Sequence, residues 1–221
     1  TILTSASAGK LLPVYKVDTK DKKVALTLNC AWNDSDIDSI LQTLKDNDCK
    51  VTFFMVGDWV KKYPEAAKKI KDAGHEIGTH SNTHPHVNNL DYEKNASELR
   101  ESAKIIKETT GADIKLYRTP YGEYNDTVIK VANENGYIPI QWSLDTLDYT
   151  KLTGEQMWDR LKNKLTSGDI ILMHNGTEHT ADSLDMIIKN IKKTGFDVVR
   201  VSDIIYTENY TIDVNGVQKK N

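Results

Sequence analysis

Three of the six histidines in this chain of 221 residues lie close together, in the stretch GTHSNTHPH from Gly78 to His86. His80 and His84 are four positions apart, a spacing that can bring two imidazoles onto one face of a turn to share a metal ion. The same spacing is also compatible with unrelated surface histidines, because HxxxH alone is a weak indication. The rest of the chain has to decide between these two interpretations.

Other polar residues follow the carboxyl ends of the strands that we expect from the sequence. In a barrel of parallel strands such positions converge on one rim, where the active site lies. A site of two histidines and one carboxylate would leave a coordination position open for a water molecule, whose pKa the metal lowers. Taken together, the loops favour a metal-dependent hydrolase. The five segments are Asn29 with the following CAWNDSD, His80, RTPYGEYN at residues 118–125, SLDTLDY at residues 143–149, and His174 in LMHNG.

Some of these residues also have purely structural interpretations. Arg118 directly follows a buried strand, so we expect a carboxylate partner for it, either Asp145 or Asp148. A lone histidine after an apolar run, such as His174, is more often a satisfied structural residue. We expect His75 and His86 to be structural or to face solvent.

Apolar runs of strand length alternate with helical patterns that end at glycines, which predicts βαβ units and a mainly parallel sheet. The predicted fold is α/β, a distorted (β/α) TIM-like barrel with about seven parallel strands. An open doubly wound sheet is the alternative, but its GxGxxG turn is missing after the first strand. The expected strands are residues 24–28, 51–56, 76–79, 115–118, 137–142, 169–173 and 197–201, and the expected helices are residues 35–46, 59–72, 92–109, 127–135, 156–165 and 183–193.

Composition excludes several classes of function. The net charge of −3 and a pI near 6.1, without a basic stripe, argue against a nucleic-acid partner. The longest apolar runs, such as DIILM, are too short for a transmembrane segment. The chain begins at Thr1 without a leader, so we expect that any signal or anchor has been removed. Cys30 and Cys49 are too few for a disulfide framework and are expected to be buried free thiols.

No Pro/Ser/Gly-rich linker divides the chain, so we expect one domain. We predict an N-terminal arm at residues 1–21, the domain at residues 22–206 and a C-terminal tail at residues 207–221. We expect a monomer.

The motifs GHEIGT, HSNTH, RTPYG, SLDTLDY and ILMH occur in this order between Lys22 and Tyr206. In order and separation they resemble the polysaccharide deacetylases of carbohydrate esterase family 4, also called the NodB homology domain. The stretch VYKVDTKDKKVALTLNCAWND is most similar to a subgroup of sporulation and cell-wall deacetylases, in which Ala-Trp replaces paired aspartates.

The resemblance implies a distorted barrel that removes acetyl groups from N-acetylated sugars. The implied partner is an acetylated glycan, foremost the N-acetylglucosamine of peptidoglycan, outside the cell or in the cell envelope of a bacterium. The implied cofactor is one divalent metal, zinc with cobalt or nickel as replacements.

The resemblance also implies roles for individual residues. His80 and His84 match the metal-binding histidines. His174 matches the general acid, Asp148 the carboxylate that tunes it, and Arg118 the arginine that orients the base. The remaining matches are the backbone N–H of Tyr121 as oxyanion donor, and Leu172, Tyr149 and Trp32 as substrate-binding residues.

The chain departs from the family pattern at two positions. Asn29 occupies the place of the aspartate that deprotonates water, and Cys30 the place of the metal-binding aspartate. We therefore choose Asp36 as the third metal ligand, with Asp34 second. An amide cannot accept a proton at neutral pH, so we expect impaired activity. The alternative is a catalytically inactive glycan-binding domain that keeps the deacetylase fold.

Overall fold

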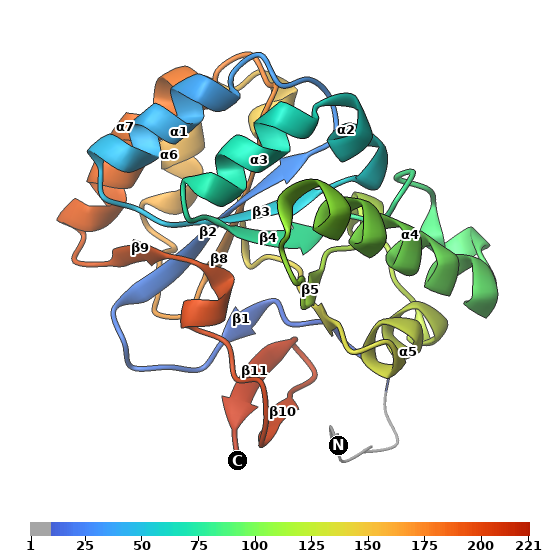
Figure 1. Cartoon of the computed structure of the whole chain (residues 1–221). Helices are drawn as coiled ribbons and strands as arrows, with labels where there is room; N and C mark the ends of the chain where they lie inside the picture. Colours follow the sequence, from blue (N-terminus) through green and yellow to red (C-terminus); the bar gives the residue numbers. More distant parts are fainter. Residues whose placement is uncertain (1–9) are drawn as a thin grey trace.

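The computed structural model describes residues 10–221 and has a curled sheet of parallel strands at its centre, with helices packed outside it (Figure 1). Every strand pair in this sheet is parallel, and the strand path does not close between its two ends within the described residues. The predicted distorted barrel of about seven parallel strands is therefore confirmed. Along the path the strands are β6 (Ile138–Pro139), β5 (Leu116–Tyr117), β4 (Glu76–Thr79), β3 (Thr52–Met55), β2 (Lys23–Cys30), β8 (Ile170–His174) and β7 (Leu144–Asp145), with β9 (Asp197–Val199) paired to β2.

Strand β2 is the centre of the sheet and sets the register of the site. It is almost wholly buried, as expected for the continuous apolar run of a parallel strand covered on both faces. Its neighbours are β3 on one side and β8 on the other, and the register places Asn29 beside Phe54 and beside His174. The first and last of the predicted site segments are therefore neighbours in space.

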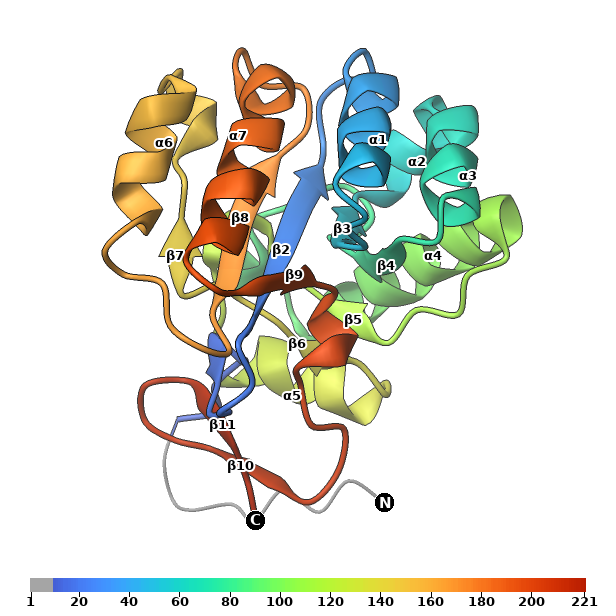
Figure 2. The ribbon, with the colours of Figure 1, turned by 90° about the vertical axis from the view of Figure 1, so that its left-hand side faces the viewer.

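Most of the predicted helices form, but one of them is divided. The helix expected at residues 59–72 is two helices, because Pro64 begins the second one and Tyr63 leaves the helical region at φ −128° and ψ 57°. Neighbouring helices contact one another over the outer face of the sheet (Figure 2). The helices are α1 (Ile37–Asp46), α2 (Gly57–Lys62), α3 (Pro64–Asp72), α4 (Tyr92–Thr110), α5 (Asp126–Glu134), α6 (Gly154–Leu161) and α7 (Thr180–Lys193).

The main core lies between this helical layer and the sheet. Because side chains alternate across a strand, Leu26, Leu28 and Cys30 of β2 face that core, while Ala25 belongs to the smaller cluster on the other face. Asn29 therefore points away from Cys30, toward the inside of the curled sheet. The expectation that Cys30 and Cys49 are buried free thiols is confirmed.

A second, small sheet joins the two ends of the described chain. It contains β1 (Lys16–Val17), β11 (Val217–Lys220) and β10 (Tyr210–Ile212), and it lies at the end of the barrel where the C-terminus is (Figure 2). Residues 1–9 of the predicted N-terminal arm lie outside the described residues, and the division into arm, domain and tail stays a prediction. Between residues 10 and 221 no helix combines the length and apolarity needed to cross a membrane.

Candidate active site

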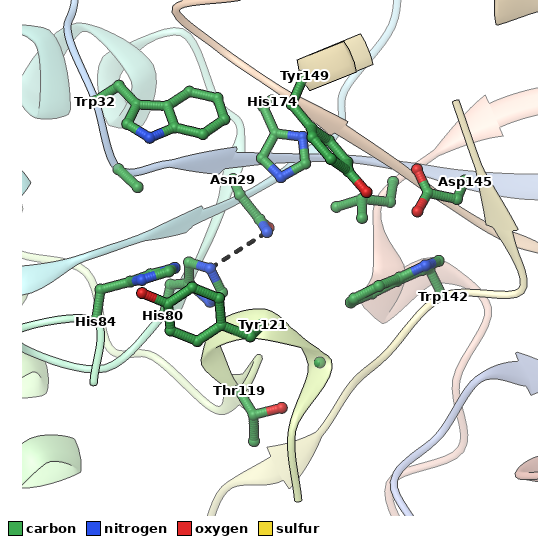
Figure 3. A pocket seen from close by; sticks show the side chains of 13 residues that line it. Asn29, Trp32, His80, His84, Thr119, Tyr121, Trp142, Asp145, Tyr149 and His174 are labelled. Atoms are coloured by element: carbon green, nitrogen blue, oxygen red, sulfur yellow. Dashed lines mark hydrogen bonds between the residues drawn. The ribbon is translucent and has the colours of Figure 1, made fainter. Parts of the chain in front are cut away.

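The loops at the carboxyl ends of the strands meet in one pocket (Figure 3). The pocket contains residues from all five of the segments that the sequence singled out, so the predicted convergence of these loops is found in the structure. Its lining residues are Asn29, Ala31, Trp32, His80, His84, Thr119, Tyr121, Gly122, Trp142, Asp145, Tyr149, Leu172 and His174.

His80 and His84 lie together on one wall of this pocket, with ring centroids 4.8 Å apart. Nδ1 of His80 is 2.8 Å from the backbone oxygen of Arg118. Because a carbonyl only accepts, Nδ1 carries the proton and Nε2 keeps its lone pair. Burial lowers the pKa of both histidines, most strongly that of His80, where the neighbouring His84 adds to the effect. Both rings are therefore neutral at pH 7, the form that binds metals.

Asn29 closes a ring of hydrogen bonds with Arg118 and His80. Nη1 of Arg118 donates to Oδ1 of Asn29 at 3.0 Å, which fixes the amide orientation because a guanidinium has no acceptor. The Asn29 Nδ2 then lies 3.3 Å from Nε2 of His80, drawn as a dashed line in Figure 3, and donates to it. The lone pair that a metal would use on His80 thus faces the hydrogens of an amide.

Arg118 is fully buried without a carboxylate beside it. Its guanidinium donates to Oγ1 of Thr27 at 2.7 Å and to the carbonyl of Gln141 at 2.9 Å, and it lies 4.2 Å from the ring centroid of Phe54. Burial lowers the pKa of Arg118 to about 9. The expectation that Asp145 or Asp148 pairs with Arg118 is wrong, since this side chain forms no ion pair with any described carboxylate.

Asp148 instead holds His174. Its Oδ1 accepts a hydrogen bond from Nδ1 of His174 at 2.8 Å, while Oδ2 accepts from the His174 backbone N–H at 2.6 Å and from Oγ1 of Thr180 at 2.7 Å. Asp148 is fully buried, so it fixes the orientation of the His174 ring from the side that faces the protein interior. Nε2 of His174 is left as the nitrogen available to a molecule in the pocket.

Three of the four large hydrophobic side chains that are exposed in the described residues line this one pocket. Trp32 and Tyr149 are each 49% exposed, and Tyr121 is 58% exposed. The His174 ring lies between Trp32 and Tyr149, with centroid distances of 5.3 and 5.4 Å. Exposed aromatic rings gathered at a concave surface are typical of a ligand site. Leu172 adds an apolar surface to the same pocket.

The structure does not bring Asp34 or Asp36 to the histidine pair, because neither residue lines the pocket. The Asp36 carboxylate accepts hydrogen bonds from the Asn175 side chain at 3.1 Å and from the Gly176 backbone at 2.7 Å, so it ties together the loops after β2 and β8. Cys30 faces the core, where burial raises the pKa of its thiol.

The donor set for a metal is therefore incomplete. Two neutral imidazoles are in place, but residues 10–221 contain no group of three His, Cys, Asp or Glu side chains arranged to hold an ion. A catalytic zinc site takes three protein ligands. His80 and His84 fit such an ion, whereas the third ligand is missing.

Sequence reasoning missed Asp145 and Trp142 as parts of the pocket. Asp145 accepts a hydrogen bond from the Leu147 backbone at 2.8 Å, and burial raises the pKa of its carboxyl group. The sequence signal for Asp145 is its place in SLDTLDY, one of the five segments at the carboxyl ends of the strands. His75 and His86 lie outside the pocket lining, as expected.

Comparison with known proteins decides the family. Residues 16–140, more than half of the chain, match the family described as polysaccharide deacetylase. The chain belongs to this family. The prediction of a polysaccharide deacetylase of carbohydrate esterase family 4 is thereby confirmed.

Two relatives illustrate the range of this polysaccharide deacetylase family. The uncharacterized protein YlxY of Bacillus subtilis is 33% identical over 193 residues, which cover 87% of this chain and 60% of YlxY. This chain thus spans about three fifths of the length of YlxY. A peptidoglycan-N-acetylglucosamine deacetylase of Bacillus cereus is 29% identical over 189 residues, which cover 84% of this chain and 69% of that protein.

Among solved structures, this chain is similar to BA3943 of Bacillus anthracis, described as a pseudoenzyme of carbohydrate esterase family 4. The TM-score is 0.85 and the identity 31%, and the match covers 95% of this chain and 73% of the other. A mutant of BA3943 with restored enzymatic activity matches with a TM-score of 0.85 and 33% identity, over 89% of this chain and 72% of the other.

Proposed function

We propose that this chain binds the N-acetylglucosamine of peptidoglycan in the pocket and hydrolyses its acetamide group, at a rate that Asn29 keeps low. The observation that carries the proposal is His174, hydrogen-bonded to the buried Asp148, in one pocket with His80, His84 and three exposed aromatic rings. Relatives of the family act on peptidoglycan, which supports this glycan as the substrate. The place of action would then be the cell envelope or the exterior of a bacterium, and we expect a monomer.

We propose a separate role in the reaction for each of the groups that line or support the pocket. His174, held by Asp148, is oriented to protonate the nitrogen that leaves as the acetamide bond breaks. The backbone N–H of Tyr121 is proposed as a donor to the oxyanion. Trp32, Tyr149 and Leu172 would contact the sugar and the acetyl methyl group. Asn29 can orient a water molecule by hydrogen bonds but cannot take its proton, and loss of a general base costs about 10²–10⁴-fold in rate.

For the cofactor we propose one divalent metal, zinc with cobalt or nickel as replacements, on His80 and His84. Such an ion polarises a carbonyl and lowers the pKa of bound water. We assign no third protein ligand to this ion. The roles given above to His174, Asp148, Tyr121 and Asn29 do not depend on the identity of that ligand.

Acetate release from N-acetylglucosamine oligomers and from peptidoglycan, with and without a chelator, tests the enzymatic proposal. We expect slow release that His174→Ala abolishes. Absence of acetate from every substrate would contradict turnover.

A second candidate function is glycan binding without turnover. Two observations favour it: the Asn29 amide in the place of a base, and the similarity to BA3943, a protein described as a pseudoenzyme. Calorimetric titration of the wild-type protein with the same oligomers, run beside the acetate assay, separates the candidates, because binding without any acetate release is expected of this second function alone. A chain that neither binds nor hydrolyses the oligomers contradicts both.

Metal analysis tests the assignment of the histidine pair. We expect His80→Ala to lose the bound ion, because it removes one of the two imidazoles on that wall. His86→Ala is the matched control, since His86 is hydrogen-bonded to Glu123 and lies outside the pocket lining. Stoichiometric metal in His80→Ala would refute the assignment.

A further inference from the structure

The loop that carries His84 is held in an unfavourable backbone conformation. Ser81 has φ 67° and His84 has φ 59°, both in the left-handed region. For residues other than glycine this region costs about 1–2 kcal/mol each, so contacts elsewhere must hold the loop in place.

Glu98, on the neighbouring helix α4, makes three of these contacts with one carboxylate. Its Oε2 accepts hydrogen bonds from the backbone N–H groups of Asn82 and Thr83, both at 2.8 Å, and its Oε1 accepts from the Thr83 hydroxyl at 2.9 Å. Hydrogen bonds to an ionised group are roughly twice as strong as neutral ones. Glu98 thus binds the two residues that link Ser81 to His84.

Contacts with the start of α2 also hold the first half of the loop, at Ser81 and Asn82. The backbone oxygen of Ser81 accepts from Gly57 at 3.0 Å, and that of Asn82 accepts from Asp58 at 2.9 Å. The Ser81 hydroxyl accepts from the His84 backbone at 3.0 Å, within the loop itself. Among the described residues, the side chain that ties the Thr83 segment to the body of the protein is that of Glu98.

We infer that Glu98 is a positioning residue for His84 and, through it, for one wall of the pocket. The His84 ring packs edge-on against His80 at 4.8 Å and against Tyr121 at 4.6 Å between centroids. Tyr121 in turn stacks on His86, at 4.3 Å with an interplanar angle of 11°. A shift of the loop therefore moves the His84 ring against two other rings of the pocket, those of His80 and Tyr121. The expected effect on glycan binding rests on the function proposed above.

The test compares Glu98→Gln with Glu101→Gln. Glutamine keeps the shape of Glu98 but loses the charge and turns one oxygen into a donor, which faces N–H groups that are donors themselves. Glu101 lies on the same helix and is exposed, and its side chain forms none of the hydrogen bonds or ion pairs found in the described residues. Glu101→Gln therefore matches the change in charge without touching the loop. Glu98→Asp, which keeps the charge on a shorter stem, is the second variant.

Each variant is studied by two methods, without added metal. NMR records the imidazole signals and the rates of amide exchange, and calorimetric titration measures the affinity for the N-acetylglucosamine tetramer. For Glu98→Gln we expect the amides of Asn82 and Thr83 to exchange about tenfold faster, and the His84 signals to move while those of the remote His75 stay. The tetramer affinity should fall about fivefold to tenfold. Glu98→Asp should lie between wild type and Glu98→Gln, and Glu101→Gln should match wild type.

The inference is overturned if the His84 signals and both amides are unchanged in Glu98→Gln. It is also overturned if the His84 and His75 signals move together, because that pattern indicates general loosening of the fold. If the wild-type protein binds no tetramer, the proposed function fails, while the NMR comparison still decides the role of Glu98.

Discussion

The Asn29 amide lies between a buried guanidinium and a neutral imidazole, with its oxygen toward Arg118 and its nitrogen toward His80. A carboxylate at this position would accept from Arg118 in the same way, and it would also neutralise a buried cation that now has no carboxylate partner. On the side that faces Arg118, the surroundings of residue 29 are thus still suited to an aspartate.

We therefore expect Asn29→Asp to raise acetate release by about 10²-fold or more, because it returns a group that can take a proton from water beside His174. The measurement is the initial rate of acetate release from N-acetylglucosamine oligomers. Asn29→Ala is the control and should show no gain, since it removes the amide without adding a base. No increase in Asn29→Asp with unchanged glycan affinity would show that the site uses another base or is no longer catalytic.

Residue types and order were enough to find most of this pocket from the sequence. Asn29 and His174 lie at the carboxyl ends of β2 and β8, and His80 and His84 follow β4. Parallel strands bring these ends to one rim. The direction of the Asp36 carboxylate could not be predicted in the same way. Asp36 lies only seven residues beyond Asn29, but its direction depends on hydrogen bonds to Asn175 and Gly176, which are remote in the sequence.

At the scale of elements, segments with a clear local sequence pattern were predictable, and segments without one were not. The expected helix at residues 92–109 is α4, and the expected strand at residues 76–79 is β4. Strand β7 was missed because its two residues, Leu144 and Asp145, owe their extended shape to pairing with β8 rather than to a local pattern. The break between α2 and α3 had a local signal in Pro64, which the apolar periodicity around it concealed.

His75 connects three elements, since it lies between α3 and β4 and its Nδ1 accepts a hydrogen bond from the Val51 backbone, just before β3, at 3.3 Å. Burial, with a smaller contribution from the nearby Lys50, lowers the pKa of His75 from 6.5 to about 4. The unfolded chain therefore binds more protons than the folded one between these pH values. His75 stabilises the fold fully above pH 6.5, and this contribution is lost as the pH falls toward 4.

The expected consequence is a pH-dependent difference between wild type and His75→Asn, whose amide oxygen can still accept from Val51. From pH 7 to pH 5 the wild-type free energy of unfolding should fall by about 1–2 kcal/mol more than that of the variant. Urea unfolding at the two pH values measures this. His80 and His84 are present in both proteins, so their contributions cancel in the difference. Parallel pH dependences would refute a neutral, buried His75.

At the scale of the whole molecule, the open barrel is joined to the small terminal sheet beside Gly168. The Val17 N–H of β1 donates to the Gly168 oxygen at 3.0 Å, and the Gly168 N–H donates to the Lys23 oxygen, at the start of β2, at 2.9 Å. Lys16 and Asp169 form an ion pair at 3.0 Å in the same place. Gly168 thus links the central strand of the barrel to the strand that pairs with the C-terminal segment.

This junction leaves no room for a side chain. Gly168 has φ 79°, and a Cβ atom there would lie 1.9 Å from the Val17 carbonyl oxygen, so β1 would have to move. Gly136 has nearly the same φ, 81°, but a Cβ atom there would meet nothing within 4 Å. Alanine substitutions at the two glycines therefore separate two free-energy costs, that of the left-handed backbone conformation and that of displacing β1.

We expect Gly136→Ala to lower the free energy of unfolding by about 1 kcal/mol, the cost of the left-handed conformation alone. Gly168→Ala should lower it by about 3 kcal/mol or more, because the shift of β1 adds an overpacking cost of about 1–3 kcal/mol. Urea denaturation of both variants measures the difference, and faster amide exchange in β1 and β11 should appear in Gly168→Ala alone. Equal losses in the two variants would mean that the terminal sheet moves away without cost, and that the barrel does not depend on it.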